Sequence, residues 1–411
     1  MKNLETLIQE LCPDGVEFRT MEEVFEIRNG YTPSKNNPDF WEGGTIPWFR
    51  MEDIRQNGRI LSDAIQHITP AAIKGKGLFP ANSIIIATTA TIGEHALVIA
   101  DSLANQRFTN LTVRKSLSAC LLPKFVFYYM FVIDEWCKKN VNAGNFASVD
   151  MKRFKKLDFP LPPIEVQTEI IHILDKFTSL EAELEAELDC RKRQYEYYRD
   201  KLLSFENVGG QEIEWKKIGE FCDTLSGFPF DSSKFQTSGI KLMRGKNVKR
   251  GYFDFNEDDD RYWESPDGLE KYLLQDKDII ISMDGSLVGK SFAMLSKKHL
   301  PLLLVQRVAR VRAKGVNQNY LFHNIAHRFS GYVDKKKTGG AIPHVSMKDI
   351  QNFSIPVPSL SEQERIANIL DRFESLTTSL QSGLPAEIAA RRQQYEHYRD
   401  KLLTFKRKGA A

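Results

Sequence analysis

The sequence predicts an α/β (α+β) protein in which two loop-rich globular domains are separated by a pair of long antiparallel coiled-coil-like helices, with an internal pseudo-two-fold. The first supporting observation is a repeat. Lys-Arg-Gln-Tyr-Glu-Tyr-Tyr-Arg-Asp-Lys-Leu-Leu-Ser-Phe at 192–205 returns as Arg-Gln-Gln-Tyr-Glu-His-Tyr-Arg-Asp-Lys-Leu-Leu-Thr-Phe at 392–405. The second observation is that a long amphipathic segment leads into each copy. The third is that about 150 residues with short β-branched runs and frequent Gly and Pro precede each long segment.

The duplication extends over the whole chain. A shift of about 196 positions superposes Gly, Pro, Gln and apolar landmarks of the first half on those of the second, so that Gly93 falls on Gly289 and Gln167 on Gln363. The last residues of each half are close copies, whereas the preceding domains share mainly these landmarks. We therefore expect two similar binding surfaces that perform different versions of one task.

Composition limits the class of protein. The chain has 411 residues, 42% of them hydrophobic, which is enough for several packed domains. Its five cysteines include no Cys-x-x-Cys pair, which argues against a disulfide framework or a structural zinc site and favours the cytoplasm. The longest apolar run, 125–133, is far below the ~20 residues that span a bilayer, so no membrane contact is expected. The net charge of +3 leaves any nucleic-acid contact to local basic patches.

The elements of the first domain follow from local patterns. Apolar residues at helical spacing in 4–11 predict a short amphipathic helix, and the β-branched runs 83–87 and 110–113 predict buried strands. The apolar segment 125–139 predicts a buried helix. The second domain repeats this order of elements, which predicts the same mixed architecture with many loops.

Proline-rich stretches at 159–163 and 355–359 end the two domains. The predicted segments are a first domain at 1–160, a central spacer helix at 161–208, a second domain at 209–356 and a C-terminal spacer helix at 357–411.

Neither Pro nor Gly occurs from 164 to 206, which predicts one long helix. The second copy carries four extra residues and two helix breakers, Gly383 and Pro385. A lone amphipathic helix of this length cannot bury its apolar stripe, so we expect the two helices to pack on each other, antiparallel if the pseudo-two-fold relates the halves. The alternative is that each helix folds back on its own domain. The predicted packing residues are Ile170, Leu174, Phe177, Leu184, Leu188, Ile366, Leu370, Phe373, Leu380 and Leu384.

Catalytic motifs are absent from the sequence. Asp-Gly-Ser-Leu-Val-Gly-Lys-Ser at 284–291 is close to a phosphate-binding loop, but three residues separate its glycines where the motif needs four. We expect a turn between a buried strand and its neighbour there. The chain has no glycine-rich cofactor loop, no Asn/Asp-Pro-Pro-aromatic motif and no His-Glu-x-x-His. No catalytic or metal-binding residue is predicted.

Basic and aromatic residues in Gly-, Asn- and Pro-containing loops suit contacts with a phosphate backbone, and Arg can read base edges by paired hydrogen bonds. Two pairs, Arg50 with Arg244 and Arg107 with Arg307, occur in both halves, although a residue kept in both copies also suits a structural role. The alternative for any one of these residues is an ordinary surface charge. The candidates are Tyr31, Lys35, Arg50, Lys74, Lys76 and Arg107 in the first domain, and Phe228, Lys234, Arg244, Lys246, Lys249, Arg250, Arg307, Lys335, Lys336 and Lys337 in the second.

The arrangement resembles the DNA-specificity (S) subunit of type I restriction-modification enzymes. The resemblance covers essentially the whole chain and rests on Gln-x-x-Ile followed by Ile-Leu-Asp, at 167–175 and 363–371, and on Tyr-Glu-x-Tyr-Arg-Asp-Lys-Leu-Leu, at 195–203 and 395–403. It implies that the two domains are target recognition domains, each reading one half of a bipartite double-stranded DNA site. It also implies that the helices set the gap and dock two modification (methyltransferase) subunits.

The same resemblance implies that this chain uses no cofactor. Methyl transfer from S-adenosylmethionine to adenine belongs to the modification subunits, and ATP- and magnesium-dependent translocation and cleavage belong to the restriction subunits. Two other functions stay open from the residues alone. One is a nuclease or toxin-like enzyme with an unrecognised active site, and the other is a coiled-coil scaffold, against which the divergent loop-rich domains argue.

Overall fold

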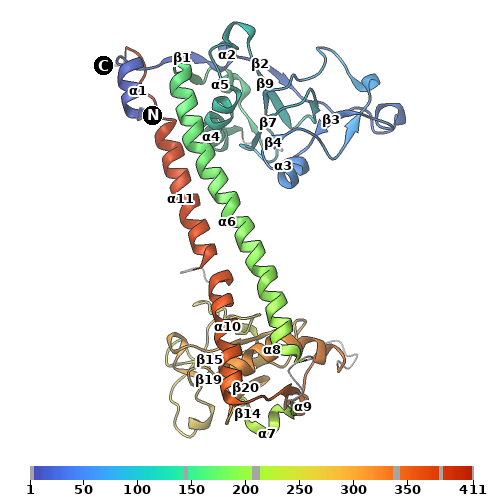
Figure 1. Ribbon diagram of the computed structural model, residues 1–411, viewed down its shortest axis with the longest axis vertical. Helices are drawn as coiled ribbons and strands as arrows, with labels where there is room; N and C mark the ends of the chain where they lie inside the picture. Colours follow the sequence, from blue (N-terminus) through green and yellow to red (C-terminus); the bar gives the residue numbers. More distant parts are fainter. Residues whose placement is uncertain (1–3, 143–146, 206–212, 337–342, 379–382, 410–411) are drawn as a thin grey trace. The chain divides into compact units, whose positions relative to one another are not determined.

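The structure, a computed structural model, describes residues 4–142, 147–205, 213–336, 343–378 and 383–409 (Figure 1). The chain divides into two units. Unit 1 comprises Met1–Glu183 and Ile388–Ala411, and unit 2 comprises Leu184–Glu387. Each unit therefore contains one globular domain together with parts of both long helical segments, because the borders fall inside the helices.

The core of unit 1 is a five-stranded, largely antiparallel sheet. The central strand Ser-Ile-Ile-Ile-Ala is buried on both faces: Ile84 and Ile86 join the core on one side, and Ile85 and Ala87 join the core on the other. Helix α4 (Pro123–Lys139) covers the first face, and a three-stranded sheet covers the second. The order of the large sheet is β2 (Phe25–Asn29), β9 (Phe108–Val113), β6 (Ser83–Ala87), β7 (His95–Val98) and β4 (Ile60–Leu61), and that of the small sheet is β5 (His67–Ile68), β3 (Ile46–Phe49) and β8 (Leu103–Ala104).

Unit 2 has the same design. Ile279 and Ile281 face the core under helix α8 (Gln318–Asp334), whereas Ile280 faces the core under a three-stranded sheet. The large sheet has the order β14 (Cys222–Ser226), β20 (Val308–Ala313), β17 (Ile279–Ser282) and β18 (Phe292–Met294), and the small sheet has the order β16 (Tyr262–Trp263), β15 (Ile240–Met243) and β19 (Leu302–Leu304).

A two-stranded antiparallel ribbon joins the beginning and the end of each domain. The proline-rich stretches predicted as boundaries form its second strand and lead directly into the long helices. The ribbons are β1 (Glu17–Thr20) with β12 (Asp158–Leu161), and β13 (Trp215–Lys217) with β21 (Ser354–Pro356). Besides the long helices, the other α-helices and strands of the described residues are α1 (Leu4–Leu11), α2 (Met21–Val24), α3 (Met51–Asn57), α5 (Met151–Lys155), α7 (Ile218–Phe221), α9 (Met347–Asn352), β10 (Val141–Asn142) and β11 (Ser148–Val149).

The long helices match the predicted breaks. Helix α6 (Ile164–Ser204) is continuous over 41 residues, as the lack of Pro and Gly predicts. The C-terminal segment contains two helices, α10 (Leu360–Thr378) and α11 (Leu384–Leu402), and residues 379–382 between them, with the predicted packing residue Leu380, lie outside the described residues.

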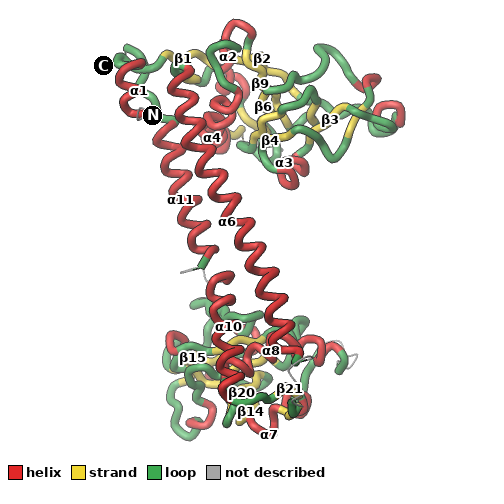
Figure 2. Tube along the Cα trace, viewed as in Figure 1, coloured by secondary structure: helices red, strands yellow, loops and turns green. Residues whose placement is uncertain are grey.

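Each long segment begins against its own domain. Ile170 and Leu174 of α6 are fully buried in the core of unit 1, and Ile366 and Leu370 of α10 are buried equally well in the core of unit 2. In unit 1, α4 lies between the sheet and α6 (Figure 2). The predicted alternative, in which a helix folds onto its own domain, therefore holds for the first turns of both segments.

Further along, the helices pack on each other in antiparallel fashion. In unit 1 the ring of Phe177 stacks on that of Tyr398 in α11 at 5.5 Å, and in unit 2 the ring of Phe373 stacks on that of Tyr198 in α6 at 5.8 Å. Both stacks have an interplanar angle of 25°. These equivalent contacts confirm helix pairing within each unit. Leu184, Leu188 and Leu384 are half-buried.

The glutamine of the Gln-x-x-Ile motif connects domain and helix in both units. The side-chain oxygen of Gln167 accepts a hydrogen bond from the Leu122 amide at 2.9 Å, just before α4, while its amide group donates to the carbonyls of Cys120 and Pro162 at 2.7 Å. Gln363 makes the equivalent bonds to the Asn317 amide and the Pro358 carbonyl. Buried backbone groups at the start of α4 and α8 are satisfied in this way.

Replacing Gln167 with Ala is expected to reduce the free energy of unfolding by about 1–3 kcal/mol, because it leaves buried backbone donors and acceptors without partners. Urea unfolding followed by fluorescence measures this change. The exposed neighbour substitution Glu165→Ala is the control and should leave the midpoint in place. Equal midpoints for both variants would show that the glutamine is not needed to hold α4.

Candidate nucleic-acid interface

Three loops of unit 1 meet at the end of the large sheet. The Tyr31 amide donates to the carbonyl of Ala104 at 2.9 Å, and the Asn105 amide donates to the carbonyl of Phe49 at 3.0 Å. Gly30 permits this approach, since a Cβ atom there would lie 2.2 Å from the carbonyl oxygen of Asn105. Residues 30–32, 49–50 and 105–107 therefore form one surface, which we call loop corner 1.

Unit 2 repeats this backbone arrangement. The Phe228 amide donates to the carbonyl of Leu304 at 3.0 Å, and the Val305 amide donates to the carbonyl of Met243 at 3.1 Å. A Cβ atom on Gly227 would lie 2.0 Å from the carbonyl oxygen of Val305. Residues 227–228, 243–244 and 305–307 form loop corner 2. The two arginine pairs shared by the halves thus occupy equivalent places, although Arg307, unlike Arg107, has a positive φ of 65°.

The outer arginines of the two corners differ in their partners. Arg107 is exposed, and next to it the Thr32 hydroxyl hydrogen-bonds the side-chain oxygen of Gln106. The side chain of Arg307 is 72% exposed and lies 3.0 Å from Asp284, which also contacts His344. An exposed glutamine precedes the outer arginine in both corners. Loop corner 1 adds the Thr32 hydroxyl, whereas in loop corner 2 the guanidinium is paired with a carboxylate.

The inner arginines are half-buried and participate in the local structure. The Arg50 amide donates to Asp53 at 2.7 Å at the start of α3, and the guanidinium lies 5.9 Å from the ring of Trp48. Arg244 donates to the carbonyl of Asp259, and burial lowers the pKa of its guanidinium. Within the described residues, the Nε atoms of both arginines are buried without a hydrogen-bond partner. These contacts favour a structural role for Arg50 and Arg244, which also agrees with the presence of this arginine in both halves.

Two aromatic candidates are occupied by intradomain contacts. The hydroxyl of Tyr31 donates to the Ala72 carbonyl at 2.7 Å and accepts from the Lys74 amide at 2.9 Å. The ring of Phe228 packs on Phe230 and Tyr272. Both residues therefore shape the loop corners. The exposed basic candidates of unit 1 are Lys35, Lys74, Lys76 and Arg107.

The basic candidates of unit 2 are partly neutralised. Lys246 forms an ion pair with Asp259, and Lys249 lies 3.6 Å from Asp254. The acids lie in other turns of the chain, so the sequence pattern did not reveal these pairs. Arg250, Lys234, Lys335 and Lys336 are exposed, and Lys337 lies outside the described residues.

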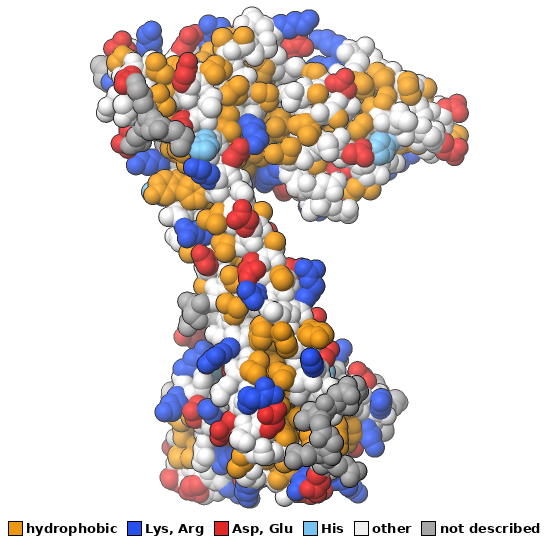
Figure 3. Space-filling view, in the orientation of Figure 1, with side chains coloured by type: hydrophobic (Ala, Val, Ile, Leu, Met, Phe, Trp, Pro, Cys, Tyr) orange, Lys and Arg blue, Asp and Glu red, His pale blue; other side chains and the backbone are white. Residues whose placement is uncertain are grey.

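Positive side chains do not collect on one broad surface of the face in Figure 3, where Lys and Arg alternate with Asp and Glu. This distribution agrees with the net charge of +3. Contacts with a polyanion at this face therefore depend on individual side chains at loops.

The segment 284–291 forms the predicted turn between the buried strand β17 and its neighbour β18. A Cβ atom on Gly289 would lie 2.9 Å from the side chain of Val333, so this glycine allows the turn to pack against α8. The glycine thus has a packing role.

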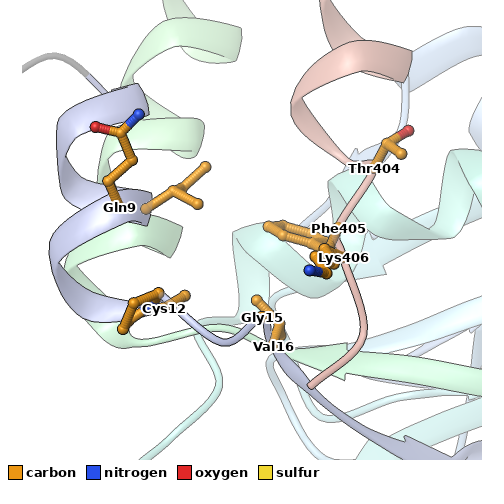
Figure 4. Close-up of a pocket in the computed structure, with 9 residues that line it drawn as sticks. Gln9, Cys12, Gly15, Val16, Thr404, Phe405 and Lys406 are labelled. Carbon is orange, nitrogen blue, oxygen red and sulfur yellow. The ribbon is translucent and has the colours of Figure 1, made fainter. Parts of the chain in front are cut away.

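A cavity of about 410 Å³ lies between α1 and the C-terminal segment of unit 1 (Figure 4). The Val16 amide donates to the Lys406 carbonyl at 2.8 Å, and the Lys408 amide donates to the Val16 carbonyl at 2.9 Å, so the two ends of the chain are joined by backbone bonds. The lining is mainly apolar, and burial raises the pKa of the Cys12 thiol. A thiol with a raised pKa is a poor nucleophile.

The family model described as the type I restriction modification DNA specificity domain matches residues 13–189 and 211–390, one match for each half of the chain. The chain belongs to this family. It is a specificity subunit with two target recognition domains, and such subunits recognise DNA without catalysing a reaction themselves. The nuclease or toxin-like alternative is not supported.

Known relatives agree over most of the chain. The EcoprrI type I restriction enzyme specificity subunit of Escherichia coli is 40% identical over 391 residues, covering 89% of this chain and 90% of that protein. The HsdS subunit from Thermoanaerobacter tengcongensis has a similar fold, with a TM-score of 0.56 at 17% identity, covering 96% of this chain and 97% of that one.

A second solved structure, from work on complex assembly and conformational transition of the type I restriction-modification system, has a TM-score of 0.60 at 17% identity and covers 95% of this chain and 97% of that one.

In the described part of this chain, the structure contains no helix that is both long and apolar enough for a membrane span.

Replacing Lys335 and Lys336 together with Ala is expected to weaken binding to all DNA sequences and to make its salt dependence shallower, by roughly 0.9 in log–log slope for each lost phosphate contact. Titrations of the assembled complex over a range of salt concentrations measure both effects. The control is Lys297→Ala with Lys298→Ala, an exposed pair in the same unit that carries the same charge. A change of base preference would instead show that Lys335 and Lys336, which follow α8, read the base sequence.

Proposed function

We propose that this specificity subunit holds one loop corner against each half of a bipartite double-stranded DNA site. We further propose that two modification subunits dock on its helices and methylate adenine from S-adenosylmethionine, while restriction subunits supply ATP- and magnesium-dependent translocation and cleavage. The assembly works in the cytoplasm. In this scheme the chain contributes recognition and assembly and uses no cofactor of its own.

The equivalence of the two loop corners is the main support for the proposed recognition of two DNA half-sites. Both use the same backbone hydrogen bonds and a glycine at the point of closest approach to bring an inner and an outer arginine onto one surface. Arg and Gln side chains are suited to paired hydrogen bonds with base edges, and exposed loops are suited to grooves.

The differences between the corners support two unlike half-sites. Both corners offer a glutamine amide, but Arg107 lies near the Thr32 hydroxyl, whereas Arg307 is held by Asp284 beside His344. A carboxylate accepts a hydrogen bond from cytosine and repels phosphate, so the second corner favours a different set of bases from the first.

A groove of about 540 Å³ in unit 1 supports docking of a modification subunit. It lies where α1, α6 and α11 meet, and apolar side chains share its lining with charged residues at its edge. Such a mixture is usual where one subunit binds another. The groove is lined by Leu4, Glu5, Ile8, Ile173, Phe177, Arg391, Gln394, Tyr398, Lys401, Leu402 and Thr404.

Exchange of residues 16–158 for the corresponding domain of a relative tests the proposal. After co-expression with the modification subunits, methylated adenines should map to a site with one new half, one old half and the same spacer length. The chain expressed alone should transfer no methyl groups, which is the control for the source of activity. Loss of both half-site preferences would contradict independent reading by the two domains.

The repeat Glu-Ala-Glu-Leu, present at 181–184 and again at 185–188, lies within the uninterrupted helix α6. A third copy adds about 6 Å of helix and turns it about 40° beyond a full revolution. One base pair adds about 3.4 Å and turns DNA by roughly 35°. The rotations nearly match, so an inserted copy is expected to lengthen the preferred DNA spacer by about one base pair, and a deleted copy to shorten it equally.

Methylation mapping on targets with spacers of graded length measures this effect. The double variant Ala182→Ser, Ala186→Ser changes two exposed residues of the repeat without changing its length and should keep the original spacer. An active complex that methylates the same spacer after the insertion would exclude a ruler role for α6.

A further inference from the structure

Three potential metal ligands meet where α8 packs on α10 in unit 2. His323 is 1% exposed, and its Nε2 lies 2.7 Å from one carboxylate oxygen of Asp371. The other oxygen of Asp371 accepts a hydrogen bond from the Asn319 amide group at 2.6 Å. Glu374 follows Asp371 by one helical turn, and the ligand atoms of His323, Asp371 and Glu374 all lie within 4.8 Å of one another.

The equivalent place in unit 1 is occupied differently. Asp175 corresponds to Asp371, but its oxygens contact the ammonium of Lys124 and the hydroxyl of Tyr128, both at 2.6 Å. Thr178 stands where unit 2 has Glu374. The ammonium of Lys124 thus compensates the carboxylate of Asp175, and this ion pair connects α4 to α6.

Unit 2 keeps the carboxylate but lacks the ammonium. Asn319 replaces the lysine, His323 replaces the tyrosine, and Glu374 brings a second carboxylate into the same space. Asp371 and Glu374 thus supply two carboxylates, where the counterpart in unit 1 has one carboxylate and one ammonium. A half-buried pair of carboxylates is costly unless a cation compensates it.

We propose that His323, Asp371 and Glu374 bind one divalent transition-metal ion, with zinc as the best match, and that this ion replaces the lysine ammonium that fastens the equivalent helices in unit 1. One imidazole nitrogen and two carboxylate oxygens are normal zinc ligands, at about 2.0–2.2 Å from the metal. Magnesium and calcium prefer all-oxygen sites, so the histidine selects against them. The ion clamps α8 of the second recognition domain to α10.

Zinc titration of the complete chain by calorimetry tests the site. The wild-type chain is expected to bind one zinc ion at this cluster and to gain thermal stability from it. Glu374→Gln removes a ligand charge with little change of shape, and the affinity of the site should fall by at least about tenfold. Asn319→Lys restores the ammonium of unit 1 and should abolish zinc binding while keeping the fold.

The matched control is Glu364→Gln, which removes an exposed carboxylate from the same helix and should leave zinc affinity unchanged. Cobalt substitution identifies the ligands, because the exposed thiols of Cys120 and Cys190 would give an intense thiolate charge-transfer band that a nitrogen and oxygen site lacks. The reciprocal triple variant Lys124→Asn, Tyr128→His, Thr178→Glu should create a second site in unit 1.

Absence of zinc binding to the folded wild-type chain would overturn the proposal, as would a zinc affinity in Glu374→Gln and Asn319→Lys that equals that of the wild-type chain. Loss of cobalt absorption only after cysteine replacement would also overturn it. These readouts do not depend on methylation or DNA binding.

Discussion

The structure depends on the apolar stripe of each long helical segment, which is covered first by the domain core and then by the other long helix. An amphipathic helix gains stability only where its stripe is covered, and two different partners cover successive parts of it. Ile170 and Leu174 enter the core of unit 1, and the next apolar residue, Phe177, stacks on Tyr398 of the antiparallel helix. The same order is found in unit 2, where Ile366 and Leu370 precede Phe373. Each recognition domain is therefore rigidly attached to its helix before helix pairing begins.

In the proposed function, this rigid attachment fixes the position of each loop corner against DNA. A loop reads DNA reproducibly only when a scaffold fixes its position, because ordering a free loop on binding costs conformational entropy. In both units the loops are fixed by backbone hydrogen bonds to neighbouring strands, and the closely approaching glycines, Gly30 and Gly227, exclude any side chain from the junction. The backbone of each corner is thus fixed by its own contacts, and the outer side chains are free to differ between the two units.

Local sequence patterns predicted the helices well, because helix formation depends on residues a few positions apart. The uninterrupted run of α6, the interruption near Gly383 and the buried helix α4 all follow from spacing, Pro and Gly. The sheet order and the ribbons closing the domains could not be derived in this way, since strand pairing joins distant segments. The same reason hid the acids that pair with predicted basic residues: Asp284 and Asp259 reach Arg307 and Lys246 only in the fold. The contacts of individual side chains at the candidate nucleic-acid interface are therefore harder to predict from the sequence than the helices or the sheets.

The two copies also show that the framework tolerates different solutions to one electrostatic problem. Asp175 and Asp371 occupy the same turn of equivalent helices and accept hydrogen bonds from equivalent positions, yet one faces a lysine and the other an amide and a histidine. An apolar core position restricts the volume of a side chain, whereas a half-buried carboxylate requires only that donors or a positive charge reach it. The apolar packing between domain and helix is therefore the same in both halves, whereas the charged and polar groups at this junction differ between them. That combination allows each half to acquire its own polar chemistry without changing how its recognition domain is mounted.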